Sequence, residues 1–199
     1  MKNFLRIAEG VDVTPLLLSI QRQSHLWQED TFLRHYPQGP FGEVETIFLR
    51  FPVKLDLSRI KSDAEKERRL ELYKQNKLAG YDQHESIDYP AYALLPEARP
   101  MIMALMTRAG GTRLGRVMIN KVNPGGQIFR HADSPEHCRY WNNRLHIVLK
   151  SAPGNDFECD GEHVWMRPGE VWWFDHSKEH AVVNNSAEER IHIIVDIKS

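Results

Sequence analysis

The second half of the chain alternates short apolar runs with turn-forming residues, a pattern that predicts β-structure. The runs are RLGRVMINKV, RLHIVLKSA, EHVWM, VWWFD, HAVVNN and RIHIIVDI, and the first three end in the turns NPGG, PGND and RPGE. Gln127 to Arg130 is a further strand candidate. Six or more short strands at a spacing of roughly 8–12 residues are typical of a sandwich or a small barrel. We therefore expect the chain after residue 112 to be all-β.

The first half of the chain has a helical or irregular pattern. Thr14 to Gln23 is predicted to be a short helix, with Thr14 as the N-cap and Pro15 at the first helical position. The run VETIFLRF is a strand candidate that ends at Pro52. The segment PEARPMIMALMTRAGG has the pattern of a buried helix that ends at two consecutive glycines. These elements are expected to support the β-rich half.

A charged segment, residues 62–77, also predicts a helix. Ser62 with Glu65 three residues later is a capping-box pattern at its start. Both charge signs are mixed along it and few of its residues are apolar, so we expect a solvated helix that packs weakly. A less favoured interpretation is an insertion that caps a site.

Composition narrows the class of protein. The chain has 199 residues, of which 41% are hydrophobic and 27% charged, and a net charge of −1, so no global basic field favours nucleic acid or an anionic membrane. The first apolar stretch is too interrupted for a signal peptide or a membrane span. Cys138 and Cys159 give no disulfide framework, which favours a cytoplasmic protein. We expect a single domain, 1–199, with a support region 1–111 and a core 112–199, in an unknown oligomeric state.

The tripeptide His131-Ala-Asp133 follows a predicted strand and is the first candidate for chemistry. In an extended segment, residues two apart point to the same side, so an imidazole and a carboxylate can converge on one point. That pair suits a metal that takes nitrogen and oxygen ligands. The alternative is chance polarity at a strand end. His137 nearby is interpreted as loop polarity, and Cys138 as a loop residue.

A second histidine cluster lies between two β-runs, where His176 and His180 are four residues apart. His180 begins the run HAVVNN and is the better ligand candidate, with His176 as its rival. Two histidines and one carboxylate without a nearby thiolate match the facial triad of non-haem Fe(II) oxygenases. A bidentate 2-oxoglutarate also needs a cation for its far carboxylate, and Arg190 lies ten residues after His180 across a predicted hairpin. A surface position for Arg190 is the alternative.

Taken together, the stretch from about residue 115 to 197 resembles the aspartyl/asparaginyl β-hydroxylase family of Fe(II)- and 2-oxoglutarate-dependent oxygenases. The resemblance is carried, in order, by RVMINKVNPGGQIFRHAD, RLHIVLK and MRPGEVWWFDHSKEHAVVNNSAEERIHIIVD. In the first half it is loose and limited to HYPQGPF and IFLRF. It implies a mainly β fold with flanking helices, in which a double-stranded β-helix of jelly-roll, cupin-like form is the core.

The resemblance also assigns roles to residues. His131, Asp133 and His180 match iron ligands, and Arg190 matches the partner of the far 2-oxoglutarate carboxylate. Three more residues match positions that line the co-substrate: Arg144, His146 and Asn120. The animal members have Gly in place of Asp133 and Ser in place of Asn120, so this chain is more similar to the bacterial- or phage-type members with a full triad.

The reaction that the resemblance implies is hydroxylation of an unactivated C–H bond, with O₂ consumed and 2-oxoglutarate converted to succinate. The expected substrate is a small molecule or a peptide, most simply an amino acid or an Asp or Asn residue. The alternative is a cupin that binds a metal or a small molecule without oxygenase activity. His192 is interpreted as a satisfied barrel histidine, and three tryptophans as barrel core: Trp165, Trp172 and Trp173.

Overall fold

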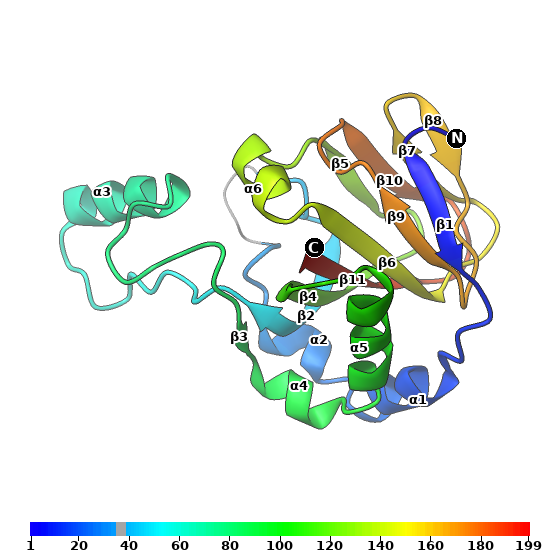
Figure 1. Cartoon of the computed structure of the whole chain (residues 1–199). Helices are drawn as coiled ribbons and strands as arrows, with labels where there is room; N and C mark the ends of the chain where they lie inside the picture. The colour runs from blue at the N-terminus through cyan, green and yellow to red at the C-terminus, as the bar shows by residue number, and fades with distance from the viewer. Residues whose placement is uncertain (35–38) are drawn as a thin grey trace.

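The computed structural model describes residues 1–34 and 39–199, and its strands form two antiparallel sheets (Figure 1). The larger sheet has the order β1-β9-β6-β11-β4-β2-β3 and the smaller one β5-β10-β7-β8. The strands are β1 (Phe4–Ala8), β2 (Val44–Phe51), β3 (Ile87–Asp88), β4 (Arg113–Val122), β5 (Gln127–His131), β6 (Asn143–Lys150), β7 (Asn155–Cys159), β8 (Glu162–Val164), β9 (Val171–Phe174), β10 (His180–Asn184) and β11 (Arg190–Lys198). The helices are α1 (Thr14–Arg22), α2 (Leu26–Glu29), α3 (Asp63–Lys74), α4 (Pro90–Leu94), α5 (Ala98–Arg108) and α6 (Pro135–Tyr140).

From β4 onward the chain passes repeatedly from one sheet to the other. Strands β4, β6, β9 and β11 belong to the larger sheet, and β5, β7, β8 and β10 to the smaller one. This alternation between two facing antiparallel sheets is the winding of a double-stranded β-helix. The predicted mainly β fold with flanking helices is therefore confirmed, and all the strands predicted after residue 112 are present. The expectation that this segment is all-β was wrong, because it contains helix α6, and strand β7 was not predicted.

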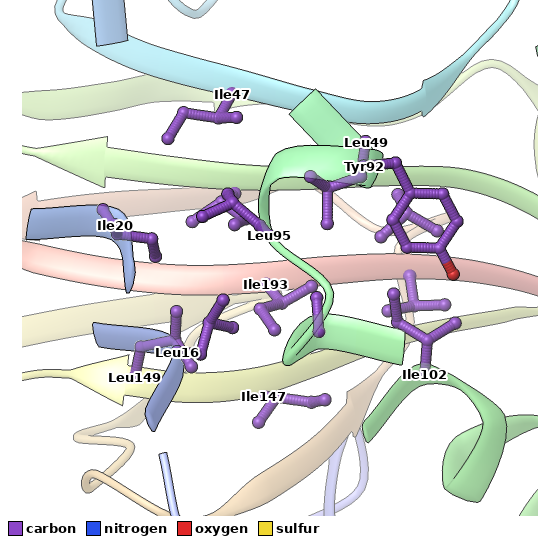
Figure 2. Packing of buried hydrophobic residues seen from close by; sticks show 14 of the residues in the cluster. Leu16, Ile20, Ile47, Leu49, Tyr92, Leu95, Ile102, Ile147, Leu149 and Ile193 are labelled. Carbon is purple, nitrogen blue, oxygen red and sulfur yellow. The ribbon is translucent and has the colours of Figure 1, made fainter. Parts of the chain in front are cut away.

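The two faces of the larger sheet differ because side chains alternate along each strand. On β11, Ile191, Ile193 and Val195 point toward the helices, and they belong to the same apolar cluster as Ile147 of β6. Figure 2 shows this cluster, with Leu16 and Ile20 of α1 and Ile102 of α5 beside strand residues. The opposite, inner face of β11 carries Arg190, His192, Ile194 and Asp196, so the polar groups of this strand face the other sheet.

The support region contributes strands as well as helices. β1 pairs with β9, and β2 pairs with β4, so both belong to the larger sheet. Figure 1 shows α1, α4 and α5 on the side of this sheet away from β5 and β10. The division of the single domain at residue 111 stays a prediction. Among the described helices, none is long and apolar enough to cross a membrane.

Two helix predictions need correction. In α1 the N-cap is Val13 rather than Thr14, so the helix begins at Thr14, one residue earlier than predicted. The Asp12 carboxylate accepts the Thr14 N–H (3.1 Å). Helix α5 is buried on one face only, where Ile102 lies, whereas Met103 is 55% exposed. Its end follows the prediction, since Gly110 takes a positive φ of 60°.

The charged segment forms α3, which extends away from both sheets in Figure 1. Ser62 is its N-cap and accepts the Glu65 N–H (3.4 Å), as predicted. Of its residues only Tyr73 is buried, which agrees with a helix that packs weakly.

Candidate metal and co-substrate site

His131, Asp133 and His180 come together between β5 and β10. His131, the last residue of β5, is the cross-strand partner of His180, the first residue of β10. Their ring centroids are 4.3 Å apart. Asp133 lies two residues beyond β5, where its N–H donates to the His176 carbonyl (3.2 Å). One donor atom from each of the three side chains lies within 4.8 Å of the other two, as a shared metal ion requires.

Each histidine of this group has one ring nitrogen fixed by the backbone. Nδ1 of His131 lies 2.8 Å from the Phe129 carbonyl, and Nδ1 of His180 lies 2.8 Å from the Lys178 carbonyl. Because a carbonyl only accepts, both protons are on Nδ1, which leaves both Nε2 lone pairs for a metal. Burial, with His131 beside it, lowers the pKa of His180 to about 4, and burial also lowers the pKa of His131. Both rings are neutral at pH 7.

Asp133 also belongs to a second donor group with His137 and His176, the rival of His180. Here Arg144 donates to Asp133 and lies 2.9 Å from Nε2 of His137. A guanidinium among the donors repels a second cation, so this group is the poorer metal site. His176 is nonetheless buried, and its Nε2 has no hydrogen-bond partner among the described residues.

Arg144 is fully paired within the protein. Its Nε and Nη2 donate to the two oxygens of Asp196 (2.8 and 3.0 Å), and its Nη1 donates to Asp133. Burial works against the charged form, but the two carboxylates outweigh it and raise the pKa of Arg144 above its usual value. Burial alone would raise the pKa of Asp133, yet the charge of Arg144 holds it below its usual range. The ligand candidate Asp133 is thus an ionised carboxylate, and the hydrogen bond from Arg144 to one of its oxygens holds it in place.

Arg190 is buried without a carboxylate. Its side chain is 2% exposed, and its one hydrogen bond among the described residues joins Nη2 to Nδ1 of His192 (3.2 Å). Burial lowers the pKa of Arg190 to about 9, which leaves it charged at pH 7. Its other neighbour is the ring of Phe157, whose centroid lies 5.6 Å from Cζ. A buried cation of this kind is costly unless an anion joins it.

The neighbours of Arg190 are further donors without acceptors. A guanidinium only donates, so His192 accepts at Nδ1 and carries its proton on Nε2, which is buried without a partner. Nδ1 of His146 lies 3.3 Å from that same Nδ1 of His192. Asn120, the cross-strand partner of His192, accepts the Thr46 hydroxyl at Oδ1 (3.0 Å) and leaves Nδ2 buried and unpartnered. Arg190, His192 and Asn120 form a pocket of donors that suits an anion.

A cavity of about 40 Å³ lies between His131 and His180 of the metal candidates and Asn120 of the donor group. His131, His146 and His180 line it together with Asn120 and Arg144. The remaining lining is apolar: Phe41, Met118, Ile128, Phe157, Phe174, Val182 and Ile194. Two nominated residues are not part of this lining. Asp133 lies with His131 and His180, and Arg190 is linked to the lining residue His146 through His192.

Two interpretations of single histidines were wrong. His137 is buried on α6 rather than in a loop, and its Nε2 contacts Asp196 (3.2 Å). Ser134 caps this helix with Pro135 at its start, a signal that the sequence contains. Cys138 follows in the same helix. His192 is not satisfied within the described part of the chain, where its Nε2 has no hydrogen-bond partner.

The tryptophans differ in burial. Trp172 is buried in the core, as predicted. Trp173 is partly buried against the apolar cluster under the helices. Trp165 is also only partly buried, and its indole N–H donates to the Ser151 hydroxyl (3.2 Å). Of the three tryptophans, only Trp172 is therefore fully buried in the core, as predicted.

Several solved structures are similar to this chain, and the first of the three described below agrees with the fold. A 2OG-Fe(II) oxygenase family oxidoreductase from Burkholderia pseudomallei is 14% identical, with a TM-score of 0.50, over 96% of this chain and 92% of that one. A prolyl-4-hydroxylase from Pseudomonas putida is 12% identical, with a TM-score of 0.49, over 98% and 92%. A cupin domain from Bordetella pertussis is 19% identical, with a TM-score of 0.35, over 44% and 85%. The chain covers less than two thirds of the length of several other similar structures.

Fold and donor set together define a double-stranded β-helix protein with a two-histidine, one-carboxylate group near a cluster of buried hydrogen-bond donors. The family description "Aspartyl/Asparaginyl beta-hydroxylase" matches residues 55–199, more than half of the chain. The chain therefore belongs to the aspartyl/asparaginyl β-hydroxylase family. A search of curated protein sequences found no significant match.

Proposed function

We propose that the protein is an Fe(II)- and 2-oxoglutarate-dependent dioxygenase that hydroxylates an unactivated C–H bond and releases succinate. The observation that carries this proposal is that two kinds of group lie close to one cavity. One is a set of three neutral or anionic donors with free lone pairs, of which His131 and His180 line the cavity. The other is Arg190, a buried arginine that contacts the lining residue Phe157 and pairs with no carboxylate among the described residues. A metal site alone would need only the first.

The donor set fits Fe(II). His131 and His180 offer Nε2, and Asp133 offers the oxygen that Arg144 does not hold, so the ligands are two nitrogens and one oxygen. Neither donor group of the described residues contains a cysteine, and the Cys159 thiol donates to the Asp175 carbonyl instead. Three protein ligands leave positions for a chelating co-substrate and O₂.

The donor pocket fits the far carboxylate of 2-oxoglutarate. Arg190 supplies the charge, and His192 Nε2 and Asn120 Nδ2 supply hydrogen bonds that no described residue accepts. Charge-assisted hydrogen bonds to a carboxylate are about twice as strong as neutral ones, and stronger still in a dry site. When the far carboxylate of 2-oxoglutarate binds, the unpaired charge of Arg190, which is unfavourable in the buried interior, becomes part of a stabilising ion pair.

The chain's residues bind, orient and shield. Fe(II) with 2-oxoglutarate and O₂ supplies the oxidising chemistry when bound. Arg144 fixes Asp133 from behind, and the Phe129 and Lys178 carbonyls fix the two histidine rings, so the ligands are preorganised. The apolar side chains of the cavity exclude water from the reacting bond. The substrate is an amino acid or an Asp or Asn residue in a peptide.

The test is an anaerobic titration of the protein with Fe(II) and 2-oxoglutarate, observed by visible absorption. We expect a weak charge-transfer band in the wild type, and succinate release after O₂ is admitted. Arg190→Met should abolish the band at wild-type 2-oxoglutarate concentrations without preventing Fe(II) binding. Arg167→Met, which alters an arginine outside the cavity, is the matched control and should leave the band unchanged. A wild type without the band, or a band that survives Arg190→Met, contradicts the proposal.

A further inference from the structure

Strand β2 adds a buried polar side chain, Thr46, to the row of residues that contains the pocket donors. Thr46 is the cross-strand partner of Asn120 on β4, and Asn120 is in turn the partner of His192 on β11. Directly opposed residues of neighbouring strands project from the same face of a sheet, so all three side chains share the inner face. Thr46 is only 3% exposed. The support region therefore contributes a residue to a wall that the core otherwise forms.

The Thr46 hydroxyl has a single hydrogen-bond partner in the part of the chain that the structure describes. Its Oγ1 lies 3.0 Å from Oδ1 of Asn120 and donates to it. A hydroxyl carries one proton, which this bond uses. In the reverse arrangement the Asn120 amide would donate to Thr46, and the hydroxyl proton would be buried without an acceptor, which is costly. The hydrogen bond thus favours one of the two orientations of the Asn120 amide.

This orientation decides what Asn120 offers to an anion. Because the amide oxygen is directed to Thr46, the other end of the amide, Nδ2, is the buried group without a partner among the described residues. Asn120 also lines the cavity. An amide turned by half a rotation would present its oxygen instead, and that oxygen would repel a carboxylate. The donor character of Asn120 therefore depends on a hydroxyl that does not line the cavity.

We propose that Thr46 is a positioning residue for 2-oxoglutarate, and that its hydroxyl holds the Asn120 amide with the NH₂ group toward the far carboxylate. The inference rests on the proposed function, which assigns that carboxylate to the donor pocket. Thr46 acts through Asn120 and does not touch the co-substrate. It also lies outside residues 55–199, the part of the chain that the family description matches. Recognition of the co-substrate is thus shared between the support region and the core.

The experiment uses the full chain, loaded anaerobically with Fe(II) and titrated calorimetrically with two co-substrates. One is 2-oxoglutarate, and the other is 2-oxopentanoate, which has the same chelating end without the far carboxylate. Thr46→Val removes the hydroxyl and keeps the branched shape, whereas Thr46→Ser keeps the hydroxyl. The matched control is Thr107→Val on α5, where the lost hydroxyl donates to the Met103 carbonyl (3.1 Å) outside the cavity. Urea denaturation establishes that each variant is folded.

We expect Thr46→Val to weaken 2-oxoglutarate binding about 3-fold and to leave 2-oxopentanoate binding unchanged, because only the far carboxylate meets the Asn120 amide. Thr46→Ser should stay within about 2-fold of the wild type, since it can make the same hydrogen bond. Thr107→Val should change neither affinity. In the double variant of Thr46→Val with Asn120→Ala, the affinity should equal that of Asn120→Ala alone, because no amide is left to orient.

Three results would overturn the proposal. The first is a Thr46→Val protein that binds 2-oxoglutarate as tightly as the wild type. The second is an equal loss for both co-substrates, which indicates a general structural effect. The third is a double variant in which the two losses multiply, since Thr46 would then act independently of Asn120. Each of these is separable from failure of the proposed function, because the wild type is titrated first, and a wild type that does not bind 2-oxoglutarate contradicts both proposals.

Discussion

Two buried arginines of the same barrel, Arg144 and Arg190, have opposite environments. Arg144 donates to two carboxylates, and its pKa is raised. Arg190 has only an imidazole nitrogen and an aromatic ring beside it, and its pKa falls to about 9. Both are almost inaccessible to solvent, so burial alone does not distinguish them. The difference is whether the anion belongs to the chain.

Because of that difference, the part of the site around Arg144 is complete within the protein, whereas the part around Arg190 can accept an anion. Around Arg144 all charges are paired, and the hydrogen bond from Arg144 orients Asp133 toward the two histidines. The part around Arg190 is incomplete, because no described residue accepts a hydrogen bond from His192 Nε2 or Asn120 Nδ2. Natural proteins leave few buried polar groups unpaired, and those that remain need an explanation such as a ligand. The predictions below test this contrast, from the largest expected effect to the smallest.

Replacing each arginine by methionine should affect stability in opposite ways. Arg144→Met leaves Asp196 and Asp133 buried without their cation, and we expect the free energy of unfolding to fall by about 3–5 kcal/mol. Arg190→Met removes an unpaired buried charge, and the metal-free protein should be as stable as the wild type or more stable. Urea denaturation of the three metal-free proteins measures this. An equal loss of unfolding free energy in Arg144→Met and Arg190→Met would contradict the proposed difference between the two arginines.

Acidification should destabilise the metal-free protein. Burial lowers the pKa of both His176 and His180 to about 4 in the folded state, against 6.5 in the unfolded chain. The stability linked to each is present above pH 6.5 and is lost as the pH falls toward 4, by about 2 kcal/mol per histidine between pH 6.5 and 5. His176→Gln should make the fall in unfolding free energy shallower by about 1 kcal/mol per pH unit. Parallel pH profiles for variant and wild type would contradict this.

Metal affinity should depend on a residue that does not touch the metal. Asp196→Asn loosens Arg144, and with it Asp133, so Co(II) affinity measured by absorption titration should fall about 10- to 100-fold. Asp156→Asn, an exposed acid on β7, is the control. If Asp196→Asn binds Co(II) as the wild type does, Arg144 does not preorganise the ligand.

The smallest effect is expected at Asn120. Asn120→Ala removes one neutral donor from the pocket, and we expect 2-oxoglutarate affinity to fall about 5-fold, equivalent to about 1 kcal/mol. Calorimetric titration of the metal-loaded protein measures it, with Asn123→Ala as a control at the end of the same strand. A loss as large as that of Arg190→Met would mean that Asn120 has another role.

The sequence predicted the β-rich half and the site residues well, because both depend on local signals. Alternation and turn residues specify the strands, and His131, Asp133 and His180 are recognised by order along the chain. Strand β1 was missed, since its five residues show no alternation and its position depends on pairing with β9. Residues 35–38 of the HYPQGPF similarity lie outside the described part of the chain.

The roles of the remaining polar residues could not be read from the sequence. His137 is buried because it lies on α6 and contacts Asp196, a residue far from it along the chain. His192 was expected to be satisfied, yet its partners depend on the register of β11 with β4 and β6. Whether a buried polar group has a partner is a property of packing, which a residue pattern does not contain.

The most direct test of the contrast between the two arginines compares 2-oxoglutarate with 2-oxopentanoate, which keeps the chelating end and chain length but lacks the far carboxylate. Both are titrated calorimetrically into the metal-loaded wild type and Arg190→Met. We expect the wild type to prefer 2-oxoglutarate by about 10- to 100-fold and the variant to show no preference, because the lost interaction is one charge-assisted pair. An equal preference in both proteins would show that Arg190 does not receive the carboxylate.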